Sequence, residues 1–416
     1  MNHTKRLARV LMPGFNRQVA LFLLYSVIWH IGMFGIIDVV LNFYFVSLGY
    51  TAETIGLLQS LPRLGGLLTG VPVGLVANRI GTRRIIVFSS LACAATLLLL
   101  VASPSLWLLG LSRFLQGLFY GSQQIANNPF MGRIVQKQHQ THLFAYHNVV
   151  SMAGTAVGSL FGGVLPTLVT LYAYDTSANA SQSPFAYGGS IVVAAVISLV
   201  SVLPLFKMAD ALGEREITDN AAWIQSDVPW VRLLKYAVPM FFFGFTGGLT
   251  FPFYNLFFRT TFNISDATVG TILSIGWLGM GLVPLLNPWL DKRFGHARAL
   301  GVTLSVAAAA FFALGAAPTL TWAVIAFAVA ISARNTMQPL FQPLVMSHLP
   351  LHLHNIASSV GLVIWNIGWF MATAISGFWQ QTYGFGFIMQ VVAVGVLVTG
   401  ASVMLIFKQR ATSNEQ

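Results

Sequence analysis

Charged residues are scarce in this sequence. Only 8% of its 416 residues are Asp, Glu, Lys or Arg, whereas about a quarter of the residues are charged in a typical soluble domain. A soluble protein of this length would have too few charges to cover its surface, so an ordinary soluble globular protein is excluded. Hydrophobic residues make up 56% of the chain, and we therefore expect it to be embedded in a lipid bilayer.

Cysteine and the motifs of enzymes are equally sparse. Cys93 is the single cysteine, so an intramolecular disulfide and a cysteine-built metal site are both impossible. The sequence has no Gly-x-x-x-x-Gly-Lys-Ser/Thr loop, no His-Glu-x-x-His and no Gly-x-Ser-x-Gly. We therefore expect no enzymatic activity, no metal site and no bound cofactor, and we do not expect ATP to drive this chain directly.

Twelve apolar stretches reach the length of about 20 residues that a membrane-spanning helix needs. The first runs for about thirty residues, which is too long for the core of a signal peptide, so we expect it to be retained. We therefore predict an all-α integral membrane protein, and the even number of spans places both termini on one side of the membrane. The stretches lie near 19–48, 54–77, 85–102, 106–132, 143–171, 187–206, 234–258, 268–289, 299–317, 320–345, 356–379 and 386–407.

The basic residues lie almost entirely on one side of these spans. Of the 22 Lys and Arg, 18 fall in alternate loops on the side that holds both termini, and only Arg259 falls in a loop on the other side. Because basic loops remain in the cytoplasm, we expect the termini and the loop 207–233 to be cytoplasmic, with the protein in a bacterial inner (plasma) membrane. The net charge of +11 then reflects topology, and nucleic acid is not an expected partner.

A segment of the first half of the chain recurs in the second half. Residues 54–163 align without gaps on residues 268–377 at an offset of 214, and 20 of the 110 positions are identical, where composition alone would give roughly eight. We therefore predict a six-helix bundle at 1–206, a cytoplasmic linker at 207–232 and a second six-helix bundle at 233–416. A solute site between two such bundles would open alternately to each side of the membrane.

The turn after the second predicted span resembles a family signature. It reads Gly74-Leu75-Val76-Ala77-Asn78-Arg79-Ile80-Gly81-Thr82-Arg83-Arg84, which resembles the signature loop of the major facilitator superfamily. Asn78 stands where that pattern has Asp, so it cannot form the charged latch ascribed to the acid. The counterpart Asp291-Lys292-Arg293-Phe294-Gly295 keeps an acid, displaced by one residue. The resemblance implies cytoplasmic gating loops that use Gly74, Asn78, Arg79, Gly81, Arg83, Asp291, Arg293 and Gly295.

Two further stretches resemble motifs of proton-linked members of this superfamily. The fourth span contains Arg113-Phe114-Leu115-Gln116-Gly117, which matches an Arg-x-x-Gln-Gly pattern. The fifth contains Gly154-x-x-x-Gly158-Ser159-x-x-Gly162-Gly163, which resembles the glycine-rich motif of drug and proton antiporters. The resemblance implies the twelve-helix major facilitator fold, in two pseudo-symmetric bundles, and proton-linked transport of drugs or small molecules. Close helix packing is the alternative explanation for the glycines.

Four formal charges lie inside predicted spans, namely Asp38, Arg63, Arg113 and Arg334. Each costs roughly 2.5–3.5 kcal/mol if it faces lipid, so each should face a partner or a watered cavity. Asp38 and Arg113 can pair and could carry a proton. Arg63 and Arg334 leave a positive surplus that would attract an anionic solute, unless helix C-terminal carbonyls neutralise it.

Uncharged polar residues extend these positions into stripes. His30, Phe34, Asp38 and Asn42 follow one another at four-residue spacing and share a face of the first span. A histidine and a carboxylate on that face could carry a proton; alternatively His30 bonds a neighbouring carbonyl and Asp38 balances an arginine. The remaining candidates for the substrate and proton pathway line a solute path or bond a neighbouring helix, and they are Gln116, Tyr120 and Gln124 beside Arg113, and Gln338 beside Arg334.

Together these patterns predict a secondary transporter that exports a small organic compound by proton-coupled alternating access. The aromatic residues of the seventh span, from 241 to 254, line an apolar cavity or face lipid. Proton-coupled uptake of an organic anion is the alternative, and a non-transporting membrane receptor or scaffold is the second. The expected partners are a small-molecule substrate and the lipid bilayer, with a proton gradient in place of a cofactor and no required oligomer.

Overall fold

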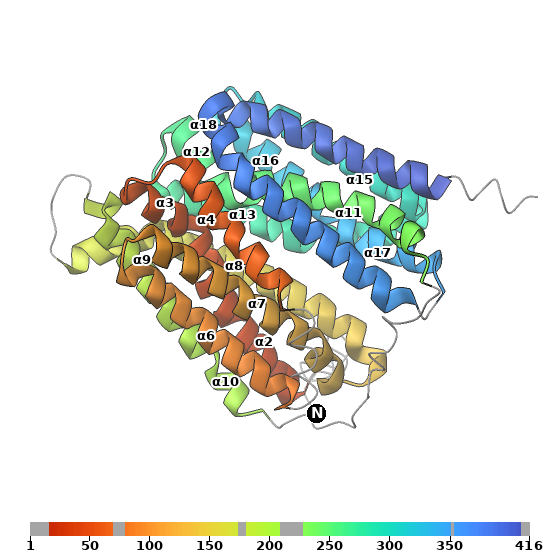
Figure 1. The fold of residues 1–416 in the computed structure, drawn as a ribbon, viewed down its shortest axis with the longest axis horizontal. Coiled ribbons are helices and arrows are strands. Elements are labelled where there is room, and N and C mark those ends of the chain that lie inside the picture. The colour runs from red at the N-terminus through yellow and green to blue at the C-terminus, as the bar shows by residue number, and fades with distance from the viewer. Residues whose placement is uncertain (1–15, 70–79, 174–179, 209–227, 351–352, 409–416) are drawn as a thin grey trace, which may run out of the picture. The chain divides into compact units, whose positions relative to one another are not determined.

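The computed structural model describes residues 16–69, 80–173, 180–208, 228–350 and 353–408, and every regular element in these ranges is a helix (Figure 1). This confirms the prediction of an all-α chain. In this part of the sequence eight helical runs are long and apolar enough to cross a membrane, and the last of them, 356–407, covers two of the predicted spans.

Contacts along the chain divide it into two compact units. Unit 1 comprises 1–48, 64–218 and 266–274, and unit 2 comprises 49–63, 219–265 and 275–416. Each unit thus takes most of its residues from one half of the sequence and one short segment from the other half.

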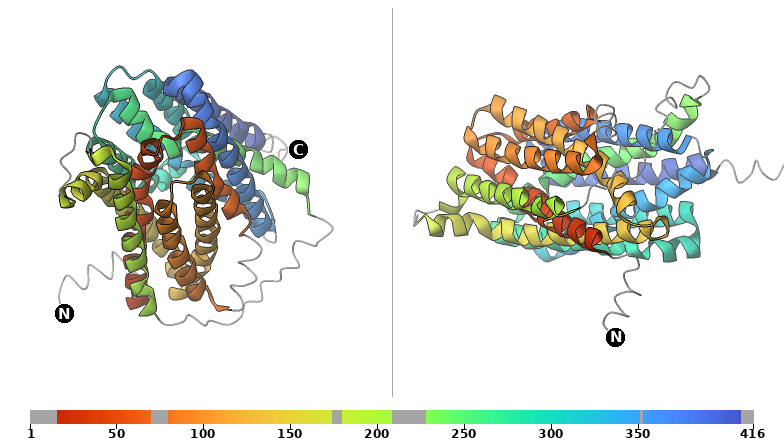
Figure 2. Two further views of the ribbon diagram at one scale, coloured as in Figure 1. Left: turned by 60° about the vertical axis from the view of Figure 1, so that its left-hand side comes forward. Right: turned by 90° about the horizontal axis from the view of Figure 1, so that it is seen from below.

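Unit 1 is a bundle of long helices. Its first run consists of α2 (Arg17–His30), a π-helix η1 (Ile31–Ile36) and α3 (Ile37–Ser47). Helices α6 and α7 lie side by side in Figures 1 and 2, and α8 packs on both α2 and η1. The remaining bounds are α6 (Thr82–Ala102), α7 (Leu106–Ile134), η2 (Lys137–His139), α8 (Gln140–Tyr172), η3 (Ala180–Gln182), α9 (Pro184–Ser201) and α10 (Leu203–Phe206).

The π-helix is the feature of unit 1 that the sequence pattern did not predict. It contains two glycines, and a Cβ at Gly32 would stand 2.7 Å from the carbonyl oxygen of Ala194 in α9, while one at Gly35 would stand 2.5 Å from Cα of Gly158 in α8. Helices that approach this closely need glycine at the contact. A π turn holds more residues than an α turn, so it rotates the residues after position 30 relative to the regular helix that we expected.

Unit 2 is interrupted at two prolines, which bend helices or break them. The seventh predicted span breaks at η5 (Phe251–Phe253), which contains Pro252, and the eighth breaks at η6 (Val283–Leu286), which contains Pro284. The last helix contains Gly384 with φ of 78°, where the chain turns between two helices. The bounds are α4 (Ala52–Leu67), α11 (Trp230–Thr250), α12 (Tyr254–Phe262), α13 (Asp266–Leu282), α14 (Asn287–Phe294), α15 (His296–Gly315), α16 (Leu320–Asn335), α17 (Met337–Ser347) and α18 (His354–Lys408). Helices α4 and α13 each contribute residues to both units, because the boundary between the units falls within them.

The sequence repeat reappears as a repeat of contacts. In unit 1 a Cβ at Gly154 would meet the carbonyl oxygen of Val27, and in unit 2 a Cβ at Gly368 would meet that of Phe241. Both residues of the first pair shift by 214 to give the second pair. The same offset relates Gly270 against Gly163 in unit 1 to Gly56 against Gly377 in unit 2. These glycines therefore serve helix packing in both units.

Candidate functional site

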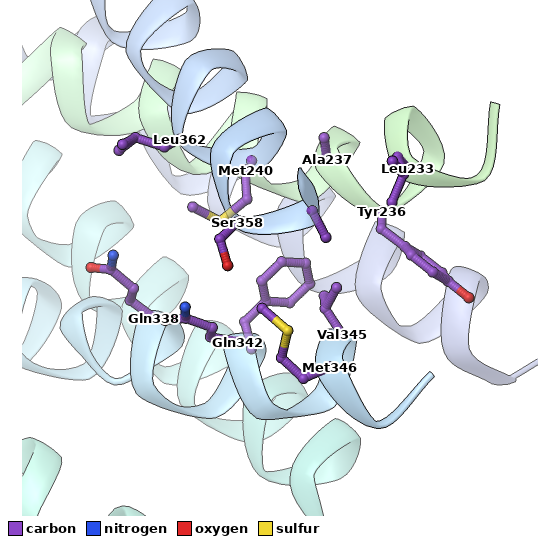
Figure 3. A pocket seen from close by; sticks show the side chains of 13 residues that line it. Leu233, Tyr236, Ala237, Met240, Gln338, Gln342, Val345, Met346, Ser358 and Leu362 are labelled. Carbon is purple, nitrogen blue, oxygen red and sulfur yellow. The ribbon is translucent and has the colours of Figure 1, made fainter. Parts of the chain in front are cut away.

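A pocket opens in unit 2 between α11, α17 and α18 (Figure 3). The empty space between its walls, part of it open to solvent, amounts to about 590 Å³. Most of its wall is apolar, and its polar side chains include Gln338, Gln342 and Ser358. Gln338 was predicted as a site residue, and it is exposed to this pocket. The apolar wall consists of Leu233, Tyr236, Ala237, Met240, Phe341, Val345, Met346, Ala357, Gly361 and Leu362.

Arg334 lies near the end of α16 with only 3% of its surface exposed. Its Nη2 donates to the carbonyl oxygen of Phe243 and, at 3.3 Å, to Oγ1 of Thr246, while its Nε has no hydrogen-bond partner among the residues that the structure describes. The guanidinium lies 4.0 Å from the ring of Phe243 and 5.3 Å from that of Phe251. Arg334 forms no ion pair with any described residue. Its hydrogen-bond acceptors are neutral oxygen atoms, so its positive charge is not compensated.

The acidic residues of unit 2 do not compensate this charge. Among its described residues these are Glu53, which is exposed, and Asp291, whose Oδ1 lies 2.5 Å from Nδ1 of His296. A cation buried without a counter-ion is costly, and an anionic ligand would relieve that cost.

An aromatic cluster connects Arg334 to Arg63. The ring of Phe251 lies 5.6 Å from that of Trp369 and 6.2 Å from that of Trp277. Arg63 of α4 lies over Trp369 at 4.3 Å and over Trp365 at 4.8 Å. The indole Nε1 atoms of Trp277 and Trp365 are buried and have no hydrogen-bond partner in the described part of the chain. We define Arg334, Phe251, Trp277, Trp365 and Trp369 as the arginine–aromatic cluster.

A glycine makes room for this cluster. A Cβ at Gly247 would stand 2.6 Å from the ring of Trp369 and 2.8 Å from Nη2 of Arg334. Such distances are shorter than van der Waals contact, so position 247 of α11 admits both side chains only as glycine. The two arginines were predicted from their charge, whereas the tryptophans were not identified; the spacing of four residues between Trp365 and Trp369 was the available signal.

Residues of the pocket and residues at Arg334 or in the arginine–aromatic cluster follow one another at about one helical turn on three helices, a rise of about 5.4 Å along each helix axis. A pocket residue stands three or four positions from a residue that belongs to the cluster or contacts Arg334. This holds on α11, on the run from α16 to α17, and on α18. These pairs are Met240 with Phe243, Gln338 with Arg334, and Leu362 with Trp365.

Unit 1 contains a second buried arginine. Arg113 of α7 is 7% exposed and donates to Oε1 of Gln116, one turn along the helix. Gln116 in turn approaches Sδ of Met33 in the π-helix at 3.9 Å. The structure thus brings Arg113 and Gln116 together, with Gln116 against the π-helix of the first helical run.

A pair of histidines lies beside this run. Nδ1 of His30 is 2.7 Å from the carbonyl oxygen of Ser26; since a carbonyl oxygen can only accept, Nδ1 carries the hydrogen and Nε2 has the free lone pair. Oγ of Ser26 also bonds Oγ of Ser151 at 3.0 Å. The ring of His147 in α8 lies 6.1 Å from that of His30. His147 was not identified from the sequence, because no charge or motif marks it.

The remaining predicted residues of unit 1 lie along the same run. The ring of Phe34 stacks on His30 at 5.2 Å and meets Tyr120 at 5.3 Å, and Gln124 donates to the Tyr120 hydroxyl. Asp38 is half-buried at the start of α3, and Asn42 is buried in that helix. The pairing of Asp38 with Arg113 stays a prediction.

The predicted gating loops are described in part. Gly74, Asn78 and Arg79 lie outside the described residues. Gly81 and Gly295 precede α6 and α15 with φ of 90° and 75°, a region open to glycine, and they are related by the repeat. Arg83 donates to the carbonyl oxygen of Met208, and Arg293 lies over Trp289 at 5.9 Å.

Two related helical units, each with a buried arginine, form the architecture of a membrane transporter built by duplication. A family model of the Major Facilitator Superfamily matches residues 23–373, and the chain therefore belongs to that superfamily. It is accordingly an integral membrane transporter and not an enzyme.

Curated relatives match at modest identity. The niacin transporter NiaP of Acinetobacter baylyi is 30% identical over 122 residues, which are 29% of this chain and 28% of that protein. The class H tetracycline resistance protein of Pasteurella multocida is 22% identical over 70% of this chain and 71% of that protein. The gentisate transporter of Corynebacterium glutamicum is 21% identical over 85% of this chain and 80% of that protein.

Solved structures show the same fold. A bacterial homologue of the human lysosomal transporter Spinster superposes with a TM-score of 0.74 at 14% identity, covering 94% of this chain and 96% of that one. The D323A mutant of the nucleoside transporter NupG gives 0.73 at 15% identity, covering 94% of this chain and all of that one.

Proposed function

We propose that this protein is a proton-coupled secondary transporter of a small organic anion that works by alternating access. It lies in a bacterial inner membrane with both termini on the cytoplasmic side. The observation that carries this proposal is Arg334, a buried cation that has no counter-ion among the described residues and lies one turn from a pocket. Buried charges in membrane segments mark substrate and ion pathways. Two relatives support the proposal, because they are named for niacin and gentisate, which are both organic acids.

Proton coupling rests on unit 1. Asp38 and His30 flank the π-helix, and Nε2 of His30 is free to accept a proton. Local π-helices occur often at functional sites. Protonation of these groups in one orientation and deprotonation in the other would link the proton gradient to solute movement, with Arg113 as the neighbouring cation.

Export of a lipophilic compound is the second candidate function. The tetracycline resistance protein aligns over 70% of this chain, and the glycines of α8 match a pattern of drug and proton antiporters. Those glycines also pack against α2 and η1, which accounts for them without a role in antiport.

Transport in proteoliposomes tests these functions. We expect purified protein to accumulate radiolabelled nicotinate or gentisate when a pH gradient is imposed, and to lose this accumulation when an ionophore removes the gradient. Transport that ignores the pH gradient would refute proton coupling. Transport of tetracycline without transport of either acid would favour the second candidate.

A further inference from the structure

We infer that the solute is a single-ring aromatic carboxylate, whose carboxylate binds at the arginine–aromatic cluster and whose ring occupies the adjoining pocket. This inference rests on the anion transport proposed above, and it adds the chemical class of the anion and its orientation.

The cluster provides what a carboxylate requires. Arg334 supplies a charge and an Nε, and Trp277 and Trp365 each supply an indole N–H, and none of these three donors has a partner within the described ranges. An ionised carboxylate is an acceptor with about four lone-pair sites and no donor, so it can satisfy several of these groups.

The distance between cluster and pocket limits the solute to a small one. The inner residues of the pocket stand about one helical turn along their helices from Arg334 and its aromatic neighbours, a rise of about 5.4 Å along the helix axis. A carboxylate attached directly to one ring spans this distance, whereas a long chain would extend beyond the inner wall. The ring then lies between Met240 and Phe341, and both thioethers and aromatic rings make favourable contacts with an aromatic solute.

The outer part of the pocket favours polar substituents on the ring. Gln342 and Ser358 line it, each one turn farther along its helix from Arg334 and Trp365 than Gln338 and Leu362, and the Ser358 hydroxyl points toward the glutamine side chains (Figure 3). Amide and hydroxyl groups both donate and accept hydrogen bonds. A ring nitrogen or a ring hydroxyl at the end away from the carboxylate therefore finds a partner here.

Three probes separate this inference from the function on which it rests. Binding to the full-length protein in nanodiscs is measured by calorimetry with benzoate, cyclohexanecarboxylate and benzamide. We expect benzoate to bind about two- to tenfold more tightly than cyclohexanecarboxylate, from the aromatic contacts, and at least about tenfold more tightly than the neutral benzamide. Equal binding of the two carboxylates would overturn the aromatic assignment and leave anion transport intact. Binding of neither carboxylate would overturn both.

A variant tests the orientation. Trp365→Phe keeps an aromatic ring and removes one N–H donor, so we expect benzoate to bind roughly tenfold more weakly. Trp289→Phe is the matched control, because Trp289 is 58% exposed in α14 and lies outside both pocket and cluster; we expect it to leave binding unchanged. Unchanged benzoate binding in Trp365→Phe would overturn the placement of the carboxylate. The comparison of the three probes needs no variant, so it stands even if Trp365→Phe does not fold.

Discussion

Arg334→Gln is the substitution that most directly tests the role of the unneutralised charge. The change removes a guanidinium that is 3% exposed and bonded to Phe243 and Thr246 of α11. Glutamine keeps a shorter amide donor at the position. The pocket residue Gln338, one turn away, is untouched.

The effect on stability is the difference of two similar quantities. The variant loses up to two charge-assisted hydrogen bonds, each of about 1.5–3 kcal/mol, and cation–π contacts of about 0.5–2 kcal/mol. It also removes the cost of a buried cation without a counter-ion, which is several kcal/mol. We therefore expect the free energy of unfolding to change by no more than about 2 kcal/mol. Binding of a carboxylate should instead weaken by roughly 10- to 150-fold, because that ligand loses a charge-assisted bond of about 1.5–3 kcal/mol.

Calorimetry with nicotinate and thermal denaturation in the same detergent measure the two quantities together. Arg298→Gln is the matched control, because Arg298 is an exposed arginine of unit 2 in α15, and its loss changes the net charge equally. A variant at position 334 that binds nicotinate with unchanged affinity would refute the role of Arg334. Weak binding accompanied by a large loss of stability would point instead to a structural arginine.

Three further predictions concern other parts of the chain. His30→Gln should retain solute binding and weaken the response of transport to a pH gradient, measured in proteoliposomes; an unaltered response would remove His30 from the proton path. Gly377→Ala should lower thermal stability, because its methyl group would meet the backbone of α4, whereas Gly361→Ala, with its nearest neighbour at 3.8 Å, should be tolerated. Gly295→Ala should destabilise the protein by about 1–3 kcal/mol in thermal denaturation, because φ of 75° with ψ of 155° suits glycine alone; Gly301→Ala within α15 should not, and equal effects would contradict this.

Much of the fold follows from one-dimensional patterns. Apolar runs of the length of the bilayer predict the helices, and prolines at 252 and 284 mark real interruptions. The offset of 214 identifies equivalent contacts, because a duplicated bundle keeps its glycines where helices touch. The π-helix could not be predicted, since it depends on how closely α8 and α9 approach Gly32 and Gly35.

The charged residues of the candidate site could be predicted, because a charge in a membrane segment is energetically unfavourable. Arg334 and Arg113 stand out because a membrane segment rarely tolerates an arginine. Trp365 and His147 do not stand out, since aromatic residues are common in such segments and their role depends on which neighbour they meet. The repeat explains part of this difference: Arg334 occupies the position equivalent to Tyr120, so the two units share a scaffold and differ in the side chains that it presents.

The exchange of short segments between the units has a consequence for how the protein is made. Unit 1 is complete only when residues 266–274 have been synthesised, and unit 2 requires residues 49–63, which emerge first. Until then, the glycine face of α8 around Gly163 lacks the start of α13 that covers it. Neither half of the sequence, expressed alone, contains all the residues of one unit, so the two halves should assemble when co-expressed and should each be degraded when made separately.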